Sequence, residues 1–242
     1  MVAPMSLPRA IVRPALVVVA VLLVAGCSGD DTSAGRPDNS AKDLLVSAKA
    51  AIDAADSAHF TITSADVPDG GTALVGGEGS AARPGQFEGS LEVSFGGTTA
   101  TVKVISTDGT VYAQLPFAST YTETDPGQFG FGDPGRFMDP DDGVSNLLVE
   151  ATEARLTGSS RIGSEVVQEV EASIPGTIVR DLLVSADPTQ PVDATFSIVK
   201  KSGELRRAVV TGPFFDKDTE STFTIVLDRY GETVDIRAPS TG

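Results

Sequence analysis

Few side chains in this sequence combine the types and the spacing that catalysis needs. A serine nucleophile requires a base beside it, and the 242 residues include a single histidine, His59. No serine stands in a G-x-S-x-G pattern. His59 lies in the segment Ser-Ala-His-Phe, where we expect an ordinary histidine at a loop or strand start. The sequence therefore argues against a serine hydrolase, and a lone histidine makes a poor metal site.

Two acidic clusters contain the remaining groups that could bind a metal or transfer a proton. Asp139, Asp141 and Asp142 resemble a calcium loop only in part, because no glutamate follows at the spacing of its bidentate ligand. The run from Asp216 to Glu220 lacks the central glycine of such a loop. A carboxylate pair acting as a glycosidase is an alternative that sequence leaves open, although aromatic residues that could stack on sugars make up only 6% of the chain. We interpret both clusters as solvated loops or helix caps, without a metal.

The segment from Gly130 to Gly135 matches the G-x-G-x-x-G pattern of dinucleotide-binding loops. It lies in a proline-rich stretch, contains Pro134, and follows no predicted strand. The strand and helix that such a loop must connect are therefore missing, and we expect no cofactor and no enzymatic activity.

The single cysteine has a more specific context. Residues 15–27 read ALVVVAVLLVAGC and follow Arg9 and Arg13. A basic start, a short apolar run and a small-residue cleavage site are typical of a secretory signal peptide, and the run is shorter than the ~20 residues of a membrane span. Its end, Val24 to Cys27, matches a bacterial lipobox, in which the cysteine is lipidated and becomes the mature N-terminus. We predict a signal peptide over 1–26 and a lipid anchor on Cys27; an ordinary signal peptide with a chance cysteine is the alternative.

This motif predicts a protein held by its anchor on the extracytoplasmic face of the cell membrane. Residues 27–39 are polar and read as a flexible tether, and residues 40–238 as a single domain. The formal net charge of −15 argues against nucleic acid, whose phosphates require Lys and Arg. It also argues against attraction to an anionic membrane surface, so membrane contact has to come from the anchor.

Alternating apolar and polar residues predict two antiparallel meanders. Gly96-Gly97 and Asp108-Gly109 read as two-residue hairpin turns. The predicted strands of the first meander are 60–63, 72–82, 87–95, 99–106 and 111–115, and those of the second are 194–200, 205–211, 221–227 and 233–237. A separate strand is predicted over 161–174.

Helices are predicted at four places, beginning with Ser40–Ala55, where apolar residues recur at three and four and Ser40 with Asp43 resembles a capping box. Two Asp-Pro pairs are helix-start signals. Asp133-Pro134 predicts a short turn, and Asp139-Pro140 predicts a helix that continues to about Leu156. A last short helix is predicted over 177–185.

The order of these segments resembles the LppX/LprAFG lipoproteins of mycobacterial-type cell envelopes, and most of all their LprG-type members. The resemblance rests on the lipobox cysteine and tether, the helix ending in Ser57-Ala58-His59, the strand from Gly89 to Gly97, and the segment from Asp108 to Leu115. It extends through the segment from Asp139 to Leu148 and the final meander with Tyr230-Gly231-Glu232.

This resemblance implies an α+β fold in which helices cover a curved antiparallel half-barrel around a hydrophobic cavity, similar to the LolA and LolB carriers. It implies a carrier of acylated lipids or glycolipids, triacylated in this family, with a major-facilitator transporter as a candidate partner. The glycine-rich segment 120–131 departs from the family pattern and is expected to reshape the cavity mouth.

Strands faced with Val, Leu, Ala and Thr would leave space under the sheet, whereas a tightly packed core is the alternative reading of the same side chains. The main rival function is an anchored scaffold that binds a partner protein without lipid cargo. With the resemblance, we expect the cavity to be lined by Leu91, Val93, Phe95, Val102, Val104, Val111, Leu147, Leu148, Ala151, Val166, Val170, Leu182, Phe196 and Ile198.

Overall fold

The computed structural model describes residues 39–68, 72–129, 132–183, 186–216 and 218–241. Cys27, the predicted signal peptide and the predicted tether up to residue 38 lie outside the described residues. The chain divides into two compact units, Met1–Ala34 and Gly35–Gly242, and only the second contains described residues.

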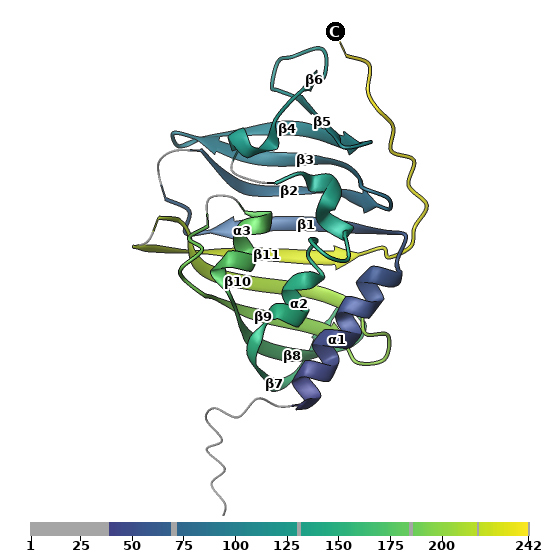
Figure 1. Ribbon diagram of the computed structural model, residues 1–242, viewed down its shortest axis with the longest axis vertical. Coiled ribbons are helices and arrows are strands. Elements are labelled where there is room, and N and C mark those ends of the chain that lie inside the picture. The colour runs from purple at the N-terminus through teal and green to yellow at the C-terminus, as the bar shows by residue number, and fades with distance from the viewer. Residues whose placement is uncertain (1–38, 69–71, 130–131, 184–185, 217, 242) are drawn as a thin grey trace, which may run out of the picture. The chain divides into compact units, whose positions relative to one another are not determined.

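An open sheet of eleven strands dominates this second unit, and every pair of neighbouring strands in it is antiparallel (Figure 1). The strand order is β6-β5-β4-β3-β2-β1-β11-β10-β9-β8-β7, so two meanders meet where β1 pairs with β11. This confirms the predicted α+β class with an open antiparallel sheet. The strands are β1 (Ser57–Ala65), β2 (Thr72–Ala82), β3 (Gln86–Phe95), β4 (Thr98–Thr107), β5 (Thr110–Gln114), β6 (Thr122–Glu123), β7 (Thr152–Ile162), β8 (Glu165–Ile174), β9 (Val192–Val199), β10 (Leu205–Asp216) and β11 (Thr219–Asp228).

The hairpin turns follow the predicted chemistry. Gly96 and Gly97 have φ of 55° and 84°, and Asp108 and Gly109 have φ of 52° and 72°. Two successive positive φ values are what a two-residue hairpin turn between twisted strands requires. These turns set the register in which Leu91 of β3 lies opposite Val102 of β4.

The helices lie on one face of the sheet (Figure 1). They are α1 (Asn39–Ala54), α2 (Asn146–Glu150) and α3 (Gly176–Leu182), with two short 3₁₀ helices, η1 (Pro126–Phe129) and η2 (Pro134–Met138). In α1 the buried residues Ala41, Leu45, Ala48 and Ile52 recur at three and four, which confirms the predicted helix and its apolar stripe. Ser40 lies inside α1 and not at its N-cap. The stripe packs α1 on α2, β7 and β10.

The helix predicted from Asp139 to Leu156 is wrong in extent. Asp139 does accept the backbone N–H groups of Asp141 and Asp142, at 2.9 and 3.1 Å, but the chain then turns at Gly143. A Cβ at Gly143 would lie 2.4 Å from the carbonyl oxygen of Asp139, so this close turn needs a glycine. Only α2 is helical, and residues from Thr152 onward pair with β8.

Two predicted strands also need correction. Segment 161–174 is not one strand, because Gly163, with φ of 57°, separates the end of β7 from β8. The segment 233–237 forms no strand. It crosses the outer face of the sheet, where Ile236 is buried in a small cluster with Ala82 and Ile105. An apolar pattern alone does not distinguish a paired strand from an extended segment that packs across strands.

Candidate functional site

A cavity of about 440 Å³ lies between the concave face of the sheet and the short helices that cover it. Because successive side chains of a strand point to opposite faces, alternate residues of the strands form its wall. The sheet contributes Phe60, Ile62, Leu74, Phe87, Leu91, Ile174, Val210, Phe214, Phe223 and Ile225, and the segments that cover the cavity contribute Pro134, Phe137, Val144, Leu147, Val179, Leu182 and Leu183. The lining is therefore mostly hydrocarbon.

Paired glycines make room for the aromatic end of this wall. Gly79 of β2 lies directly opposite Gly89 of β3, and a Cβ on Gly79 would lie 3.0 Å from the ring of Phe60. The rings of Phe60 and Phe87 stack at 5.3 Å, and Phe137 of η2 approaches Phe60 at 5.1 Å. Glycine at both positions lets the rings of Phe60 and Phe87 lie flat against the sheet. The contact between Phe137 and Phe60 then joins the covering helix η2 to this wall.

The cover is fixed to the sheet through Asp133, the N-cap of η2. Its carboxylate accepts the backbone N–H of Gly135 at 2.8 Å and the hydroxyl of Ser106 in β4 at 2.7 Å. Pro134 follows at the first helical position, as the Asp-Pro signal predicts. The predicted turn at this position is confirmed, and it holds Phe137 over the cavity.

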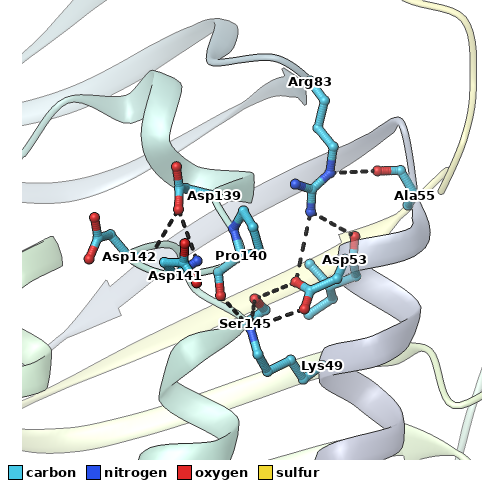
Figure 2. A network of polar contacts seen from close by, with 10 residues as sticks. Lys49, Asp53, Ala55, Arg83, Asp139, Pro140, Asp141, Asp142 and Ser145 are labelled. Atoms are coloured by element: carbon cyan, nitrogen blue, oxygen red, sulfur yellow. Dashed lines mark hydrogen bonds and ion pairs between the residues drawn. The ribbon is translucent and has the colours of Figure 1, made fainter.

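A polar network joins α1 to the loop that precedes α2 (Figure 2). Asp53 of α1 accepts the buried Ser145 hydroxyl at 2.7 Å and lies 3.0 Å from the Lys49 ammonium. Lys49 also donates to Ser145 at 3.2 Å and to the carbonyl oxygen of Pro140. These contacts, here called the α1–loop network, hold the segment 140–147 whose Val144 and Leu147 line the cavity.

Arg83, in the turn between β2 and β3, links this network to the first meander of the sheet (Figure 2). Its guanidinium donates to the carbonyl oxygens of Ala55 at 3.1 Å and Ile52 at 3.4 Å, at the end of α1. It also lies 3.8 Å from Asp53. One end of α1 is thereby tied both to the sheet and to the loop covering the cavity.

The cavity lining includes few charged groups. Arg136 forms an ion pair with Asp142, while Asp133 is engaged in the cap described above. Asp181 completes the acidic residues of the lining. None of the described lining residues is Ser, Cys, His or Lys.

His59 lies in β1 away from the cavity. Its Nδ1 is 2.9 Å from Oδ1 of Asp228 on the paired strand β11. Within the described part of the chain, no group of three or more His, Cys, Asp or Glu side chains is arranged to hold a metal ion. Among the same residues, no helix is long and apolar enough to cross a membrane.

The structure brings only part of the predicted cavity residues together. Leu91, Leu147 and Leu182 line the cavity. The others that are buried lie in the surrounding hydrophobic core and not on the cavity wall; these are Val93, Val102, Val104, Val111, Leu148, Ala151, Val170, Phe196 and Ile198. Leu148 and Ala151 belong to α2 and its C-cap, and the others lie on the concave face of the sheet, where other side chains fill the space beside them.

Two of the predicted cavity residues are exposed and do not line this cavity. Phe95 follows the alternation of Leu91 and Val93, but it lies at the end of β3 and is 39% exposed. Val166 lies at the start of β8 and is 46% exposed. The described residues 120–129 of the glycine-rich segment do not line the cavity either.

Sequence reasoning missed the aromatic residues of the wall. Phe60, Phe87, Phe137, Phe214 and Phe223 all line the cavity, although small side chains were expected to create the space. The alternation of Phe60 with Ile62 was a usable signal, and so were the paired glycines that accommodate the rings. The space exists because the cover is short and not because the wall is made of small residues.

The chain is an α+β protein in which short helices cover an apolar cavity on an open antiparallel sheet, and comparison with known proteins places it in one family. The family model of the LppX_LprAFG lipoproteins matches residues 40–236, so the chain belongs to that family. It is 26% identical over 232 residues to the lipoarabinomannan carrier protein LprG of Mycobacterium tuberculosis, covering 96% of this chain and 95% of LprG.

The chain is also 26% identical over 249 residues to lipoprotein LprA of Mycobacterium tuberculosis, covering 96% of this chain and 98% of LprA. The crystal structure of LprF from Mycobacterium bovis has a TM-score of 0.67 at 18% identity and covers 86% of this chain and 100% of LprF. Lipoprotein LppX of Mycobacterium tuberculosis has a TM-score of 0.60 at 15% identity, covering 83% of this chain and 100% of LppX. These two structures share the fold.

Proposed function

We propose that this protein is an envelope lipoprotein that binds the acyl chains of a lipid or glycolipid in the cavity and transfers the lipid, without catalysing a reaction. The main support for the proposal is the cavity of about 440 Å³ with its mostly apolar lining. Ligand sites are mostly apolar, largely pre-formed, and ~300–1,000 Å³ in volume. The relative named as a lipoarabinomannan carrier supports a glycolipid as the cargo.

The cavity volume suggests how much of the cargo it can hold. An apolar cavity of ~150 Å³ accommodates one benzene molecule, so this cavity corresponds to about three benzene volumes, on the order of 18 carbon atoms. That is about one long acyl chain. We infer that a triacylated cargo would place one chain inside, with the others entering only if the cover moves.

The affinity would come from the hydrophobic effect. Each methylene removed from water contributes ~0.8 kcal/mol, so binding should strengthen with the length of the chain that enters. Phe60, Phe137 and Leu91 would contact that chain. The pair of Arg136 and Asp142 would lie beside the polar end of the ligand, since these two are among the few charged groups of the lining.

The decisive experiment is lipid extraction from the purified full chain. Organic solvent removes non-covalent lipid but leaves the thioether-linked anchor on the protein, so mass spectrometry of the extract reports cargo alone. We expect an acylated lipid, and less of it in the Leu91→Trp variant, whose indole would occupy cavity volume. An extract without lipid, together with no uptake of a fluorescent acyl probe, would instead favour a scaffold that binds a partner protein. A major-facilitator transporter is then the partner to test first.

The anchor on Cys27 is a separate part of the proposal. One acyl chain gives only marginal membrane binding, whereas a lipidated cysteine supplies two or three. The Cys27→Ala variant should be found soluble or with its signal peptide uncleaved, as judged by fractionation and intact mass. A mature-sized, unmodified variant that still sediments with membranes would refute the anchor.

A further inference from the structure

The turn after β5 presents an aromatic side chain to solvent on a sterically disfavoured backbone. In the turn from Leu115 to Ala118, the Ala118 N–H donates to the Leu115 carbonyl oxygen at 3.0 Å. Pro116 occupies the second position, and Phe117 the third, with φ of 68°. This is a type II turn, whose third position favours glycine or asparagine because a side chain there crowds the backbone.

The fold gains no packing from the ring of Phe117, because its relative exposure is 108%. The turn is well defined all the same, since the side-chain amide of Gln114 donates to the Ala118 carbonyl oxygen at 3.1 Å. A bulky side chain in a strained and fully exposed position stabilises nothing within the chain. Its role therefore has to be sought in contact with another surface.

Strand register places this turn close to the cavity wall. Gln114 is paired with Lys103, so the turn begins beside Val102 of β4, which lies opposite Leu91 of β3. Leu91 lines the cavity. With strands ~4.8 Å apart, the start of the turn is two strand spacings, or about 10 Å, from the cavity wall.

Two further apolar side chains of the first meander are exposed on the cavity side of the sheet. Phe95 follows Leu91 and Val93 on the concave face at the end of β3 and is 39% exposed. Leu115 continues the alternation of the buried residues Val111 and Ala113 and is 46% exposed. Phe95, Leu115 and Phe117 are here called the apolar rim.

We propose that the apolar rim inserts into the hydrocarbon layer of a lipid bilayer and so places the cavity against the membrane. The proposal rests on the proposed function, because a rim inserted in the bilayer, with the turn about 10 Å from the cavity wall, would shorten the path of an acyl chain between bilayer and cavity. The apolar rim is expected to contact the hydrocarbon of the bilayer and not an anionic headgroup. Glu123 and Asp125 follow the turn, and the chain carries a formal net charge of −15, so an anionic headgroup would be repelled. Insertion is therefore expected to persist at high salt.

The sequence contains no tryptophan, so a single introduced tryptophan reports only its own surroundings. The test uses the full chain with its anchor, reconstituted in phosphatidylcholine vesicles with and without bromine on the acyl chains. Side chains at the membrane interface lie ~5–10 Å into the acyl boundary, and we expect bromine to lower the Phe117→Trp emission by about half. Val166→Trp, which replaces an exposed apolar side chain in β8 near the opposite edge of the sheet, is the matched control and should be quenched far less.

A second measurement separates this proposal from the proposed function. Phe117→Ser should slow the transfer of a fluorescent acyl lipid between vesicles severalfold without changing the amount bound at equilibrium, and Val166→Ser should change neither. Phe117→Gly, which suits the positive φ, should behave like Phe117→Ser and shows that the effect is not misfolding. Equal or absent quenching at positions 117 and 166 would overturn the membrane-inserting rim while leaving lipid binding intact, whereas loss of cargo in the extraction experiment would overturn the function itself.

Discussion

Two regions of the concave face follow the same strand pattern but differ in how they are filled. In the filled region, Val170, Phe196 and Ile198 are buried in the core to which the stripe of α1 belongs. In the cavity region, residues such as Phe60 and Leu91 border about 440 Å³ of space. Both regions present alternating apolar side chains from β-strands, so the wall does not cause the difference.

The difference lies in the cover. α1 has 16 residues and a continuous stripe that includes Leu45 and Ile52, which fill the space above the sheet. The cavity is covered by η2, with five residues, by the loop before α2, and by α3, with seven residues. Short elements bring fewer apolar side chains to the sheet per unit of area. A packed core and a ligand cavity can therefore be made on one sheet by changing only the length of the covering helices.

The largest expected contrast between the two regions comes from truncating one leucine in each. Leu148→Ala in the filled region should lower the free energy of unfolding by about 3–5 kcal/mol, because it opens a new cavity in a packed core. Leu91→Ala should cost nearer ~2 kcal/mol, since its side chain already borders open space and mainly the transfer contribution is lost. Urea denaturation of delipidated protein measures both values. Equal losses would show that the cavity closes in solution.

Adding volume should again destabilise the filled region more than the cavity region. Ile198→Trp overpacks the filled region and should lower the free energy of unfolding by roughly 1–3 kcal/mol. Leu91→Trp should leave the melting temperature nearly unchanged and sharply weaken acyl-chain binding, because the indole can enter the cavity. A large drop in melting temperature for Leu91→Trp, with acyl uptake unaltered, would contradict a role of this cavity in binding.

The α1–loop network connects the filled region to the cavity region. Removing one side-chain oxygen atom should weaken it. Ser145→Ala removes the buried hydroxyl that donates to Asp53 and should cost about 1 kcal/mol. It should also speed the release of a bound acyl lipid, because the loop that carries Val144 and Leu147 is held less firmly. Ser202→Ala, at an exposed serine that contacts Glu204, is the control. Unchanged release kinetics in Ser145→Ala would show that this loop does not limit exchange.

The smallest effect concerns an ion pair at one end of β8. The hydrogen bond from Arg206, 2.6 Å long, holds the pKa of Glu165 below its ordinary value of 4.5. A lowered carboxyl pKa stabilises the fold above the unfolded-state pKa, and this contribution disappears as the pH falls through the folded-state value. Glu165→Gln should therefore lose stability at pH 7, by less than ~1 kcal/mol at this partly exposed site, and match the wild type in strong acid. A larger loss would mean that ion pairing and not packing stabilises the filled region.

Local pattern predicted the architecture well where the chain makes its contacts with near neighbours. The hairpins at Gly96-Gly97 and Asp108-Gly109, the stripe of α1 and the cap at Asp133 each depend on a few adjacent residues, and all are confirmed. The helix from Asp139 failed because Gly143 turns the chain after its first hydrogen bonds. The cap signal marks where a turn starts and carries no information on its length.

The candidate site was harder to predict, because an alternating strand shows which side chains face the core but not which covering element they meet there. Leu91 and Val93 share one face of β3, yet only Leu91 borders the cavity. Phe95 shares that face as well and is partly exposed, since the strand extends past the cover. Which residues of an alternating strand meet a ligand depends on the placement of η2 and α3, and no pattern within the strand encodes it.

The pairing of β1 with β11 also has a consequence for how the protein can fold. His59 and Asp228 face each other across this pair although 169 positions separate them in the chain. Contacts between residues so distant in sequence slow folding, and β1 presents an unpaired edge until the last strand has been synthesised. An unpaired edge is a site of aggregation. We therefore expect this chain to depend on being kept unfolded, or bound by a holding factor, until its C-terminal strand is available.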